Sequence, residues 1–240
     1  MGTPEPRMNW WRDGPAVAFA AVFPTVAAWF YFVRPADEGT MRIFYAAGKG
    51  VQFAFPALWV WLVQRTRPRW PLTRRGVGWG LGFGLLVVAA MLGLYHGYLK
   101  ESPYLAGTRA SLEEKLTQIG ADTPAAFLAM AVFICVLHAA FEEYYWRWFV
   151  FGQLRRGLPP VPAGVLASLA FAAHHVLVLD VYLGAEHFWT ATLFFALCVA
   201  AGGAVWAWLY HRTGSLSGPW LSHLLVDAGL MWIGYDLMWR

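Results

Sequence analysis

Glu142 and Glu143 are adjacent carboxylates inside a long apolar segment, where ionisable side chains are costly unless they face a cavity or a partner. Glu143 stands four residues before Arg147, in the order that favours an ion pair along a helix. Glu142 points about 100° away from Glu143, with His138 on its face one turn earlier. A carboxylate placed in this way can act as a general base. A purely structural Glu–Arg clamp between helices is the alternative explanation of this segment.

Two later apolar segments carry imidazoles and a third carboxylate. His174 and His175 lie in the first, and His223 and Asp227 share a helical face in the second. At 1.5 Å per helical residue, Glu142 lies ~20 Å, His175 ~22 Å and His223 ~16 Å from the arginine-bearing end of its own segment. These three side chains are therefore predicted to meet at one level near the middle of a bilayer.

Together these residue types can hydrolyse a carbonyl compound with activated water. A carboxylate takes the proton, imidazoles hold the water, and further donors stabilise the oxyanion. The chain has no Walker loop, no HExxH sequence and no Ser in a G-x-S-x-G context. A proton-coupled transporter is another use of intramembrane Glu, His and Asp, but the chain shows no inverted repeat.

The composition indicates a membrane protein. Of the 240 residues, 59 % are hydrophobic and 13 % are charged, whereas soluble domains have ~45–50 % and ~25 %. This composition argues against a soluble enzyme, a disordered chain and a disulfide scaffold. The net charge is +4, but the Arg residues stand in short loops, as in membrane proteins, so no nucleic acid is expected as a partner. We predict an all-α, polytopic transmembrane bundle with about seven spans, at 15–33, 43–64, 77–98, 124–151, 161–182, 188–210 and 216–236.

The loops predict how this bundle is oriented. Arg is concentrated in loop 65–75, after the fourth span and after the sixth span, and basic loops stay in the cytoplasm. The N-terminal segment 1–14 should then be cytoplasmic and the C-terminus external, in a single integral-membrane domain over 1–240. Any opening of the buried site is expected toward the cytoplasm. Loop 99–123 should contain a short interfacial helix, and Thr123-Pro124 has the pattern of a helix start.

Three short motifs on successive late segments resemble those of the CPBP intramembrane proteases. They are Glu142-Glu143-x-x-x-Arg147, Phe171-x-x-x-His175 and His223-x-x-x-Asp227. This family includes the type II CAAX prenyl endopeptidases, also called Ras-converting enzymes, and the bacterial abortive-infection and bacteriocin-immunity proteins. The resemblance covers about residues 120–236, and the first three spans match only in being transmembrane.

The resemblance implies a role for each residue of the first two motifs. Glu142 would be the general base that activates water, and His175 would help to hold that water. Glu143 and Arg147 would fix the rotation of their helix about its axis. The family has been described both as zinc enzymes and as metal-free glutamate proteases. The sequence fits either description, since Glu142, His175 and His223 could ligate zinc with water as the fourth ligand. We expect no metal cofactor, with zinc as the alternative.

The third motif departs from the family pattern, which most often ends in Asn where this chain has Asp227. His223 and Asp227 would face the scissile carbonyl and stabilise the oxyanion. An ionised Asp would repel an oxyanion, so Asp227 is either protonated or orients His223 by accepting from its ring N–H, and we favour the second role. The motif spacing selects His175, so His174 is expected on another face, and His138 is expected to be structural or interfacial.

The resemblance also implies an activity and a location. The chain would be an endopeptidase that cleaves near the membrane-embedded or lipidated C-terminal part of a protein or peptide, in the plasma (inner) membrane of a bacterium. Its partners would be that membrane-associated substrate and the lipid bilayer. A non-catalytic immunity or scaffold protein that keeps the cavity is a competing interpretation.

Overall fold

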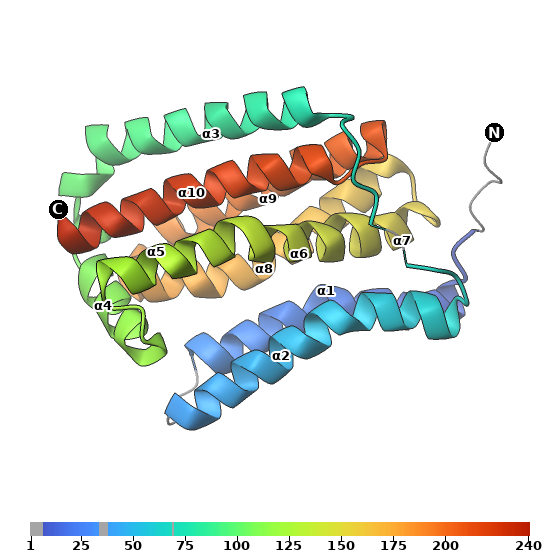
Figure 1. Cartoon of the computed structure of the whole chain (residues 1–240), viewed down its shortest axis with the longest axis horizontal. Helices are drawn as coiled ribbons and strands as arrows, with labels where there is room; N and C mark the ends of the chain where they lie inside the picture. Colours follow the sequence, from blue (N-terminus) through green and yellow to red (C-terminus); the bar gives the residue numbers. More distant parts are fainter. Residues whose placement is uncertain (1–6, 34–37, 69) are drawn as a thin grey trace.

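The computed structural model describes residues 7–33, 38–68 and 70–240, and within these ranges the chain forms helices and no strand (Figure 1). The predicted all-α class is therefore confirmed. The α-helices are α1 (Trp10–Phe32), α2 (Glu38–Leu58), α3 (Val77–Gly97), α4 (Thr108–Ile119), α5 (Pro124–Val132), α6 (Ala139–Glu143), α7 (Gly152–Arg155), α8 (Pro160–Leu183), α9 (Leu193–Thr213) and α10 (Ser217–Trp239). π-helical segments lie at Trp59–Val63, Phe133–His138, Tyr144–Phe151 and Phe188–Thr192, and 3₁₀ segments at Leu99–Glu101, Pro103–Leu105 and Ala185–His187.

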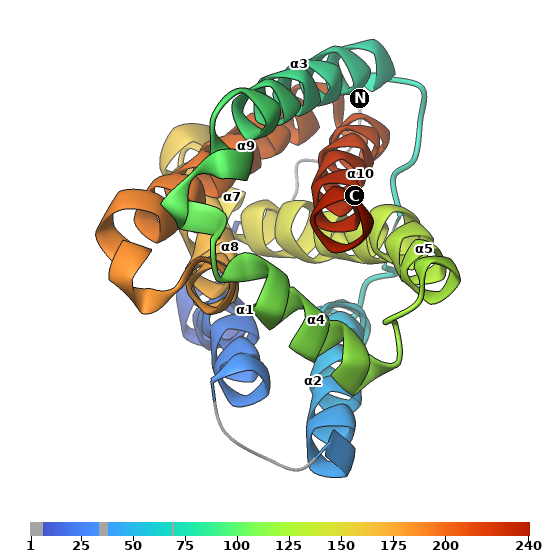
Figure 2. The ribbon, with the colours of Figure 1, turned by 90° about the vertical axis from the view of Figure 1, so that its left-hand side faces the viewer.

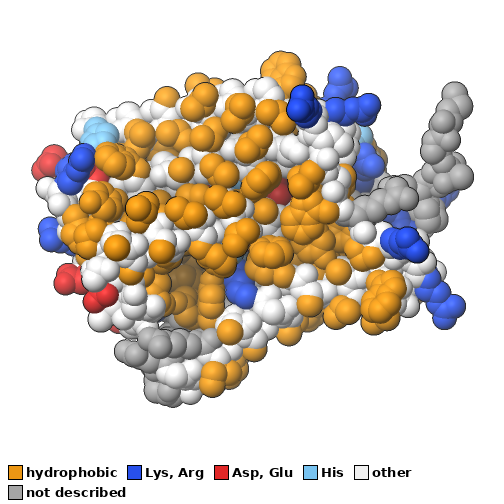
Figure 3. Space-filling view, in the orientation of Figure 1, with side chains coloured by type: hydrophobic (Ala, Val, Ile, Leu, Met, Phe, Trp, Pro, Cys, Tyr) orange, Lys and Arg blue, Asp and Glu red, His pale blue; other side chains and the backbone are white. Residues whose placement is uncertain are grey.

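Five helical segments are long and apolar enough to cross a membrane. They are Trp10–Phe32, Val77–Glu101, Pro124–Arg155, Pro160–Leu183 and Ala185–Thr213. The other two predicted spans, at 43–64 and 216–236, also fall on long helices, α2 and α10, but these lie outside the five. Apolar side chains cover the middle of the molecule in Figure 3, and charged side chains gather at its two ends. This arrangement is that of an integral membrane protein.

The long helices run side by side along the molecule and alternate in direction (Figure 1). One end, which we call the arginine-rich end, holds the start of α1, the loop residues 64–68 and 70–76, and the turns 156–159 and 214–216. It carries Arg65, Arg67, Arg74, Arg75, Arg155, Arg156 and Arg212. The segment 98–123 lies at the opposite end, where Figure 2 shows α4 crossing the bundle. α4 confirms the short helix predicted in this loop.

Small residues bring α3 and α10 into close contact. Gly80 of α3 faces Gly218 of α10 so closely that a Cβ atom added at Gly80 would overlap the Gly218 carbonyl group. Small residues let membrane helices approach each other in this way. The contact fixes α10 against the bundle, and with it the side chains of His223 and Asp227.

One continuous helix, Pro124–Arg155, carries the first motif. The Thr123 hydroxyl accepts a hydrogen bond from a backbone N–H of the first turn, as the Thr-Pro start predicts. The π-helical segments Phe133–His138 and Tyr144–Phe151 stand on either side of the two glutamates. Such segments are frequent at functional sites, and the apolar pattern of the sequence did not predict them.

The tightly packed core fills the half of the molecule next to the arginine-rich end. Its largest side chains come from the second half of the long helix, including Tyr145, Trp146, Phe149 and Phe151, all 1 % exposed or less. They pack with the neighbouring halves of α1, α8 and α9. Aromatic packing therefore closes the bundle between the glutamate pair and the arginine-rich end.

Candidate active site

The predicted Glu143–Arg147 ion pair is present and buried. Arg147 Nη1 donates to Glu143 Oε1 at 2.9 Å, and the two side chains are 2 % and 0 % exposed. The guanidinium lies 4.6 Å from the ring centroid of Phe171 and 4.8 Å from that of Trp206. Gly203 leaves room for it, because a Cβ there would lie 3.2 Å from Arg147 Nη2. The pair therefore neutralises Glu143 and holds the long helix at this level.

His223 of α10 is held by Glu143. Its Nδ1 lies 2.8 Å from Glu143 Oε1, and its ring stacks on Trp206 with 4.4 Å between centroids. Asp227, which we expected to orient this ring, has its Oδ1 3.6 Å from His223 Nε2, too far for a hydrogen bond. Glu143, rather than Asp227, is therefore the carboxylate within hydrogen-bond distance of this ring, and it lies between Arg147 and the imidazole.

Glu142 is buried among imidazoles. Its Oε1 lies 3.9 Å from His138 Nε2 and 3.7 Å from His174 Nε2, and its Oε2 lies 3.8 Å from His223 Nε2. Among the described residues, no Lys or Arg nitrogen lies within 4 Å of this carboxylate. Side chains from the long helix, α8 and α10 therefore surround Glu142, and the α8 residue whose nitrogen is directed at it is His174, whereas the depths were predicted for His175.

The expectation that His174 faces away from Glu142 is wrong. Its ring lies parallel to that of Trp146, with 5.8 Å between centroids, and its Nε2 is directed at Glu142. Consecutive helical residues diverge by about 100°, but the rings of His174 and His175 bend toward each other, with 4.1 Å between centroids. Both imidazoles therefore belong to the site.

His175 is oriented by its own helix. Its Nδ1 lies 3.0 Å from the Phe171 carbonyl oxygen, which can only accept, so Nδ1 carries the proton and Nε2 is left for a ligand. One ligand atom from each of Glu142, His174 and His175 lies within 4.8 Å of the others. Among the described residues, this group can hold a metal ion, and it contains His174 in place of the predicted His223.

A cavity of about 270 Å³ extends from Glu142 toward the opposite end. Beyond the glutamate it is lined by Tyr31 at the end of α1, Tyr45 on α2, Val178 on α8 and Leu230 on α10. Figure 3 shows the molecule hollowed between α2 and α5, with a basic side chain in the hollow. The predicted opening toward the arginine-rich loops is therefore wrong, because the aromatic core fills that half of the bundle.

Lys49 of α2 is a cavity residue that the motifs did not identify. Its Nζ lies 3.1 Å from His138 Nε2 and 5.4 Å from the ring centroid of Phe53. Within the described ranges, no carboxylate oxygen lies within 4 Å of this ammonium. His138 therefore lies between Lys49 and Glu142: its Nε2 can accept from the ammonium, and at 3.9 Å from Glu142 Oε1 it makes no hydrogen bond with the carboxylate. A lysine inside a predicted span is the signal that could have revealed it.

Comparison with protein families matches residues 124–229 to the family described as type II CAAX prenyl endopeptidase Rce1-like. The match runs from the start of the long helix into α10. It includes the predicted site residues Glu142, Glu143, Arg147, His175, His223 and Asp227. Comparison with curated proteins and with solved structures gives no match. Lys49, on α2, lies outside the matched part.

Proposed function

Because residues 124–229 match the family described as type II CAAX prenyl endopeptidase Rce1-like, we propose that this chain is an intramembrane endopeptidase. It hydrolyses a peptide bond near the C-terminal, membrane-embedded or lipidated part of a protein or peptide, in the plasma membrane of a bacterium. The observation that carries the proposal is Glu142, a buried carboxylate at the inner end of a cavity that faces three imidazoles. Its neighbour Glu143 is neutralised by Arg147, so the two glutamates have different tasks.

In the proposed reaction, Glu142 is the general base. Water held between Glu142 and the rings of His174 and His175 gives one proton to Glu142 while its oxygen bonds to the carbonyl carbon. Glu142 then passes this proton to the leaving nitrogen as the C–N bond breaks. The products are a carboxylic acid and an amine, and Glu142 returns to its starting state.

His223 is the proposed donor to the oxyanion. Since Nδ1 is directed at Glu143, Nε2 is the ring atom that faces Glu142 and Asp227. A proton on Nε2 can be donated to the oxyanion of the tetrahedral intermediate. With Nδ1 also donating to Glu143, the ring is an imidazolium whose positive charge Glu143 balances. Asp227, which does not orient the ring, is protonated in this proposal and so does not repel the oxyanion.

The donor set also fits zinc. Glu142, His174 and His175 supply the nitrogen and oxygen ligands of catalytic zinc sites, and His175 Nδ1 is directed at a backbone carbonyl, as is usual for a metal-binding His. When bound, zinc supplies a Lewis acid that activates water and polarises the carbonyl. We propose the metal-free reaction, and sensitivity to a chelator distinguishes the two.

The proposal includes seven spans with the N-terminus in the cytoplasm. α2 has 21 residues and α10 has 23, enough to cross a bilayer, and both run beside the five apolar helices (Figure 1). The arginine-rich end then faces the cytoplasm. Because the cavity extends to the opposite end, substrate and water reach Glu142 from the external side.

Cysteine labelling tests the direction of the cavity. Gly48 lines it, and a Cβ there would lie 3.7 Å from Ala27 Cβ, an ordinary contact. In a cysteine-free background, a membrane-impermeant maleimide added outside intact cells should label Gly48→Cys and Ala110→Cys on α4. Leu72→Cys, at the arginine-rich end, should stay unlabelled until the membrane is opened. External labelling of Leu72→Cys alone would show that the bundle is inverted.

Lys49→Met should lower kcat/KM for hydrolysis about tenfold, as expected for the loss of one hydrogen bond to a charged group. The change removes the cation beside His138 but keeps an unbranched side chain next to the Phe53 ring. Lys49→Arg should restore part of the rate. The values of kcat/KM of wild type and both variants are measured on the same peptide, and circular dichroism checks that each variant is folded. A wild-type rate for Lys49→Met would exclude Lys49 from the site.

A cleavage screen tests the activity itself. Purified wild type and Glu142→Ala are placed in lipid vesicles with a mixed set of transmembrane and lipidated peptides, and new termini are read by mass spectrometry. Cleavage by wild type alone that survives a zinc chelator is the expected result. Loss of cleavage with the chelator would favour the zinc reaction. Equal cleavage by both proteins would contradict the role of Glu142.

A further inference from the structure

A second pocket lies at the arginine-rich end, apart from the catalytic cavity. Its volume is about 310 Å³, and it is lined by Arg155 of α7, the following Arg156, Pro160 of α8 and His211 of α9. It shares no lining residue with the cavity around Glu142. The proposed hydrolysis uses none of these side chains, so the pocket requires another explanation.

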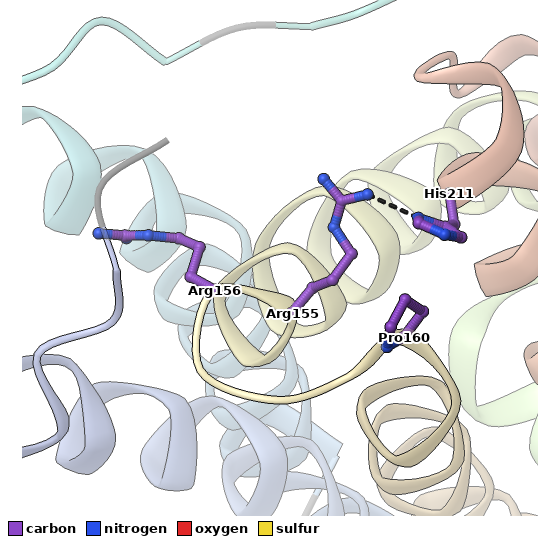
Figure 4. A pocket seen from close by; sticks show the side chains of 4 residues that line it. All are labelled: Arg155, Arg156, Pro160 and His211. Carbon is purple, nitrogen blue, oxygen red and sulfur yellow. Dashed lines mark hydrogen bonds between the residues drawn. The ribbon is translucent and has the colours of Figure 1, made fainter. Parts of the chain in front are cut away.

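The pocket presents hydrogen-bond donors. Figure 4 shows Arg155 pointing to His211, and Arg155 Nη1 lies 2.6 Å from His211 Nδ1. Nδ1 must accept this hydrogen bond, so the proton of the neutral ring is on Nε2. Arg155 keeps further N–H groups, and no carboxylate of the described residues lies within 4 Å of it. Arg156 points away in Figure 4, toward Asp13, with 3.9 Å between Nη2 and Oδ2.

Three helix ends meet at this pocket. Pro160 is the first residue of the 24-residue helix α8, whose N-terminus carries partial positive charge, while α7 and α9 end here and bring the partial negative charge of their C-termini. The positive charge of the pocket therefore comes from its side chains: a guanidinium and an imidazole face one space, and no acid of the described structure lines it. A guanidinium fork fits the paired oxygens of a phosphate group particularly well.

The surroundings favour a lipid as the source of this phosphate. Exposed apolar side chains continue from the pocket along α8, at Val161, Val165 and Leu169. Trp208 of α9, also exposed, lies one turn before His211 and has the amphipathic ring typical of the membrane interface. We propose that the pocket binds the phosphate-bearing headgroup of an anionic lipid, with its acyl chains against this face of α8 and α9.

Lipid retention tests the site without any need for proteolysis. The protein is purified from vesicles of equal phosphatidylglycerol and phosphatidylcholine content, and bound lipids are counted by native mass spectrometry. Wild type should retain phosphatidylglycerol preferentially. The double variant Arg155→Gln/His211→Gln should retain at least about fivefold less phosphatidylglycerol than wild type. This factor corresponds to the usual contribution of one basic residue near an anionic membrane. Arg155→Lys keeps the charge but loses the guanidinium fork, so it should retain an amount of phosphatidylglycerol between those of wild type and the double variant.

Arg74→Gln is the matched control, because it removes one positive charge from the same end, outside the pocket. It should retain lipid like wild type, and thermal unfolding of each variant should match wild type. Equal losses in Arg74→Gln and the double variant would overturn the proposal in favour of diffuse attraction. Displacement of the lipid by millimolar inorganic phosphate would overturn it in favour of a free-phosphate site. If the double variant unfolds, Arg155→Lys gives the same comparison.

Discussion

Replacing Glu142 with Gln should lower the rate of peptide-bond hydrolysis by about 10²–10⁴-fold, the usual contribution of a general base. The amide keeps the size of the side chain but cannot take a proton from water. The bundle should remain folded, because Glu142 has no Lys or Arg within 4 Å among the described residues whose charge would be left unpaired. The rate is measured in vesicles on a peptide that the cleavage screen identifies.

Glu114→Gln is the matched control for this substitution. Glu114 is exposed on α4, at the opposite end, where its Oε1 accepts a hydrogen bond from Gln118 Nε2 at 3.0 Å. The same chemical change there should leave the rate at the wild-type value. A rate for Glu142→Gln within tenfold of wild type would show that another group takes the proton.

The course of the helices was largely predictable from the sequence. Each of the seven apolar runs falls on a long helix, because a bilayer accepts only long stretches of apolar residues with satisfied backbone groups. The Thr123-Pro124 start and the α4 helix were also predicted correctly. These features depend on local sequence, so they could be predicted without knowledge of how the helices pack.

The site was predictable only where its contacts are local. Glu143 and Arg147 are one helical turn apart, so their ion pair followed from spacing alone. The contact of Glu143 with His223 joins two separate helices, as does that of Lys49 with His138. Such contacts depend on how each helix is rotated about its axis, and the spacing of motifs within one helix does not contain that information.

The prediction of the direction in which the cavity opens was also wrong, for a physical reason. Apolar runs extend through both halves of every predicted span, so hydropathy gives no preference for either end. The difference lies in packing. Aromatic residues follow the glutamates in Tyr144–Phe151 and interlock in the core of the arginine-rich half. The other half has aromatic residues as well, such as Tyr31 and Tyr45, but there they line the cavity together with Gly48. How the helices pack, which hydropathy does not contain, decides where the cavity lies.

Arg147→Met should lower the free energy of unfolding by about 3–5 kcal/mol, the usual cost of removing one partner of a buried ion pair. Methionine fills part of the space between Phe171 and Trp206 but leaves Glu143 as a buried charge with only His223 beside it. Reversible unfolding of the protein in mixed micelles with increasing sodium dodecyl sulfate measures the change.

The double variant Glu143→Leu/Arg147→Met separates stability from chemistry. With both charges replaced by apolar side chains, no buried charge remains unpaired, and most of the lost stability should return. Hydrolysis should still be lost, because His223 no longer has the carboxylate that accepts from its Nδ1. Arg212→Met, at an exposed position of the arginine-rich end, should change neither property. If Arg147→Met lies within 1 kcal/mol of wild type, the ion pair does not hold the helix, and the coupling of Arg147 to His223 through Glu143 has no energetic basis.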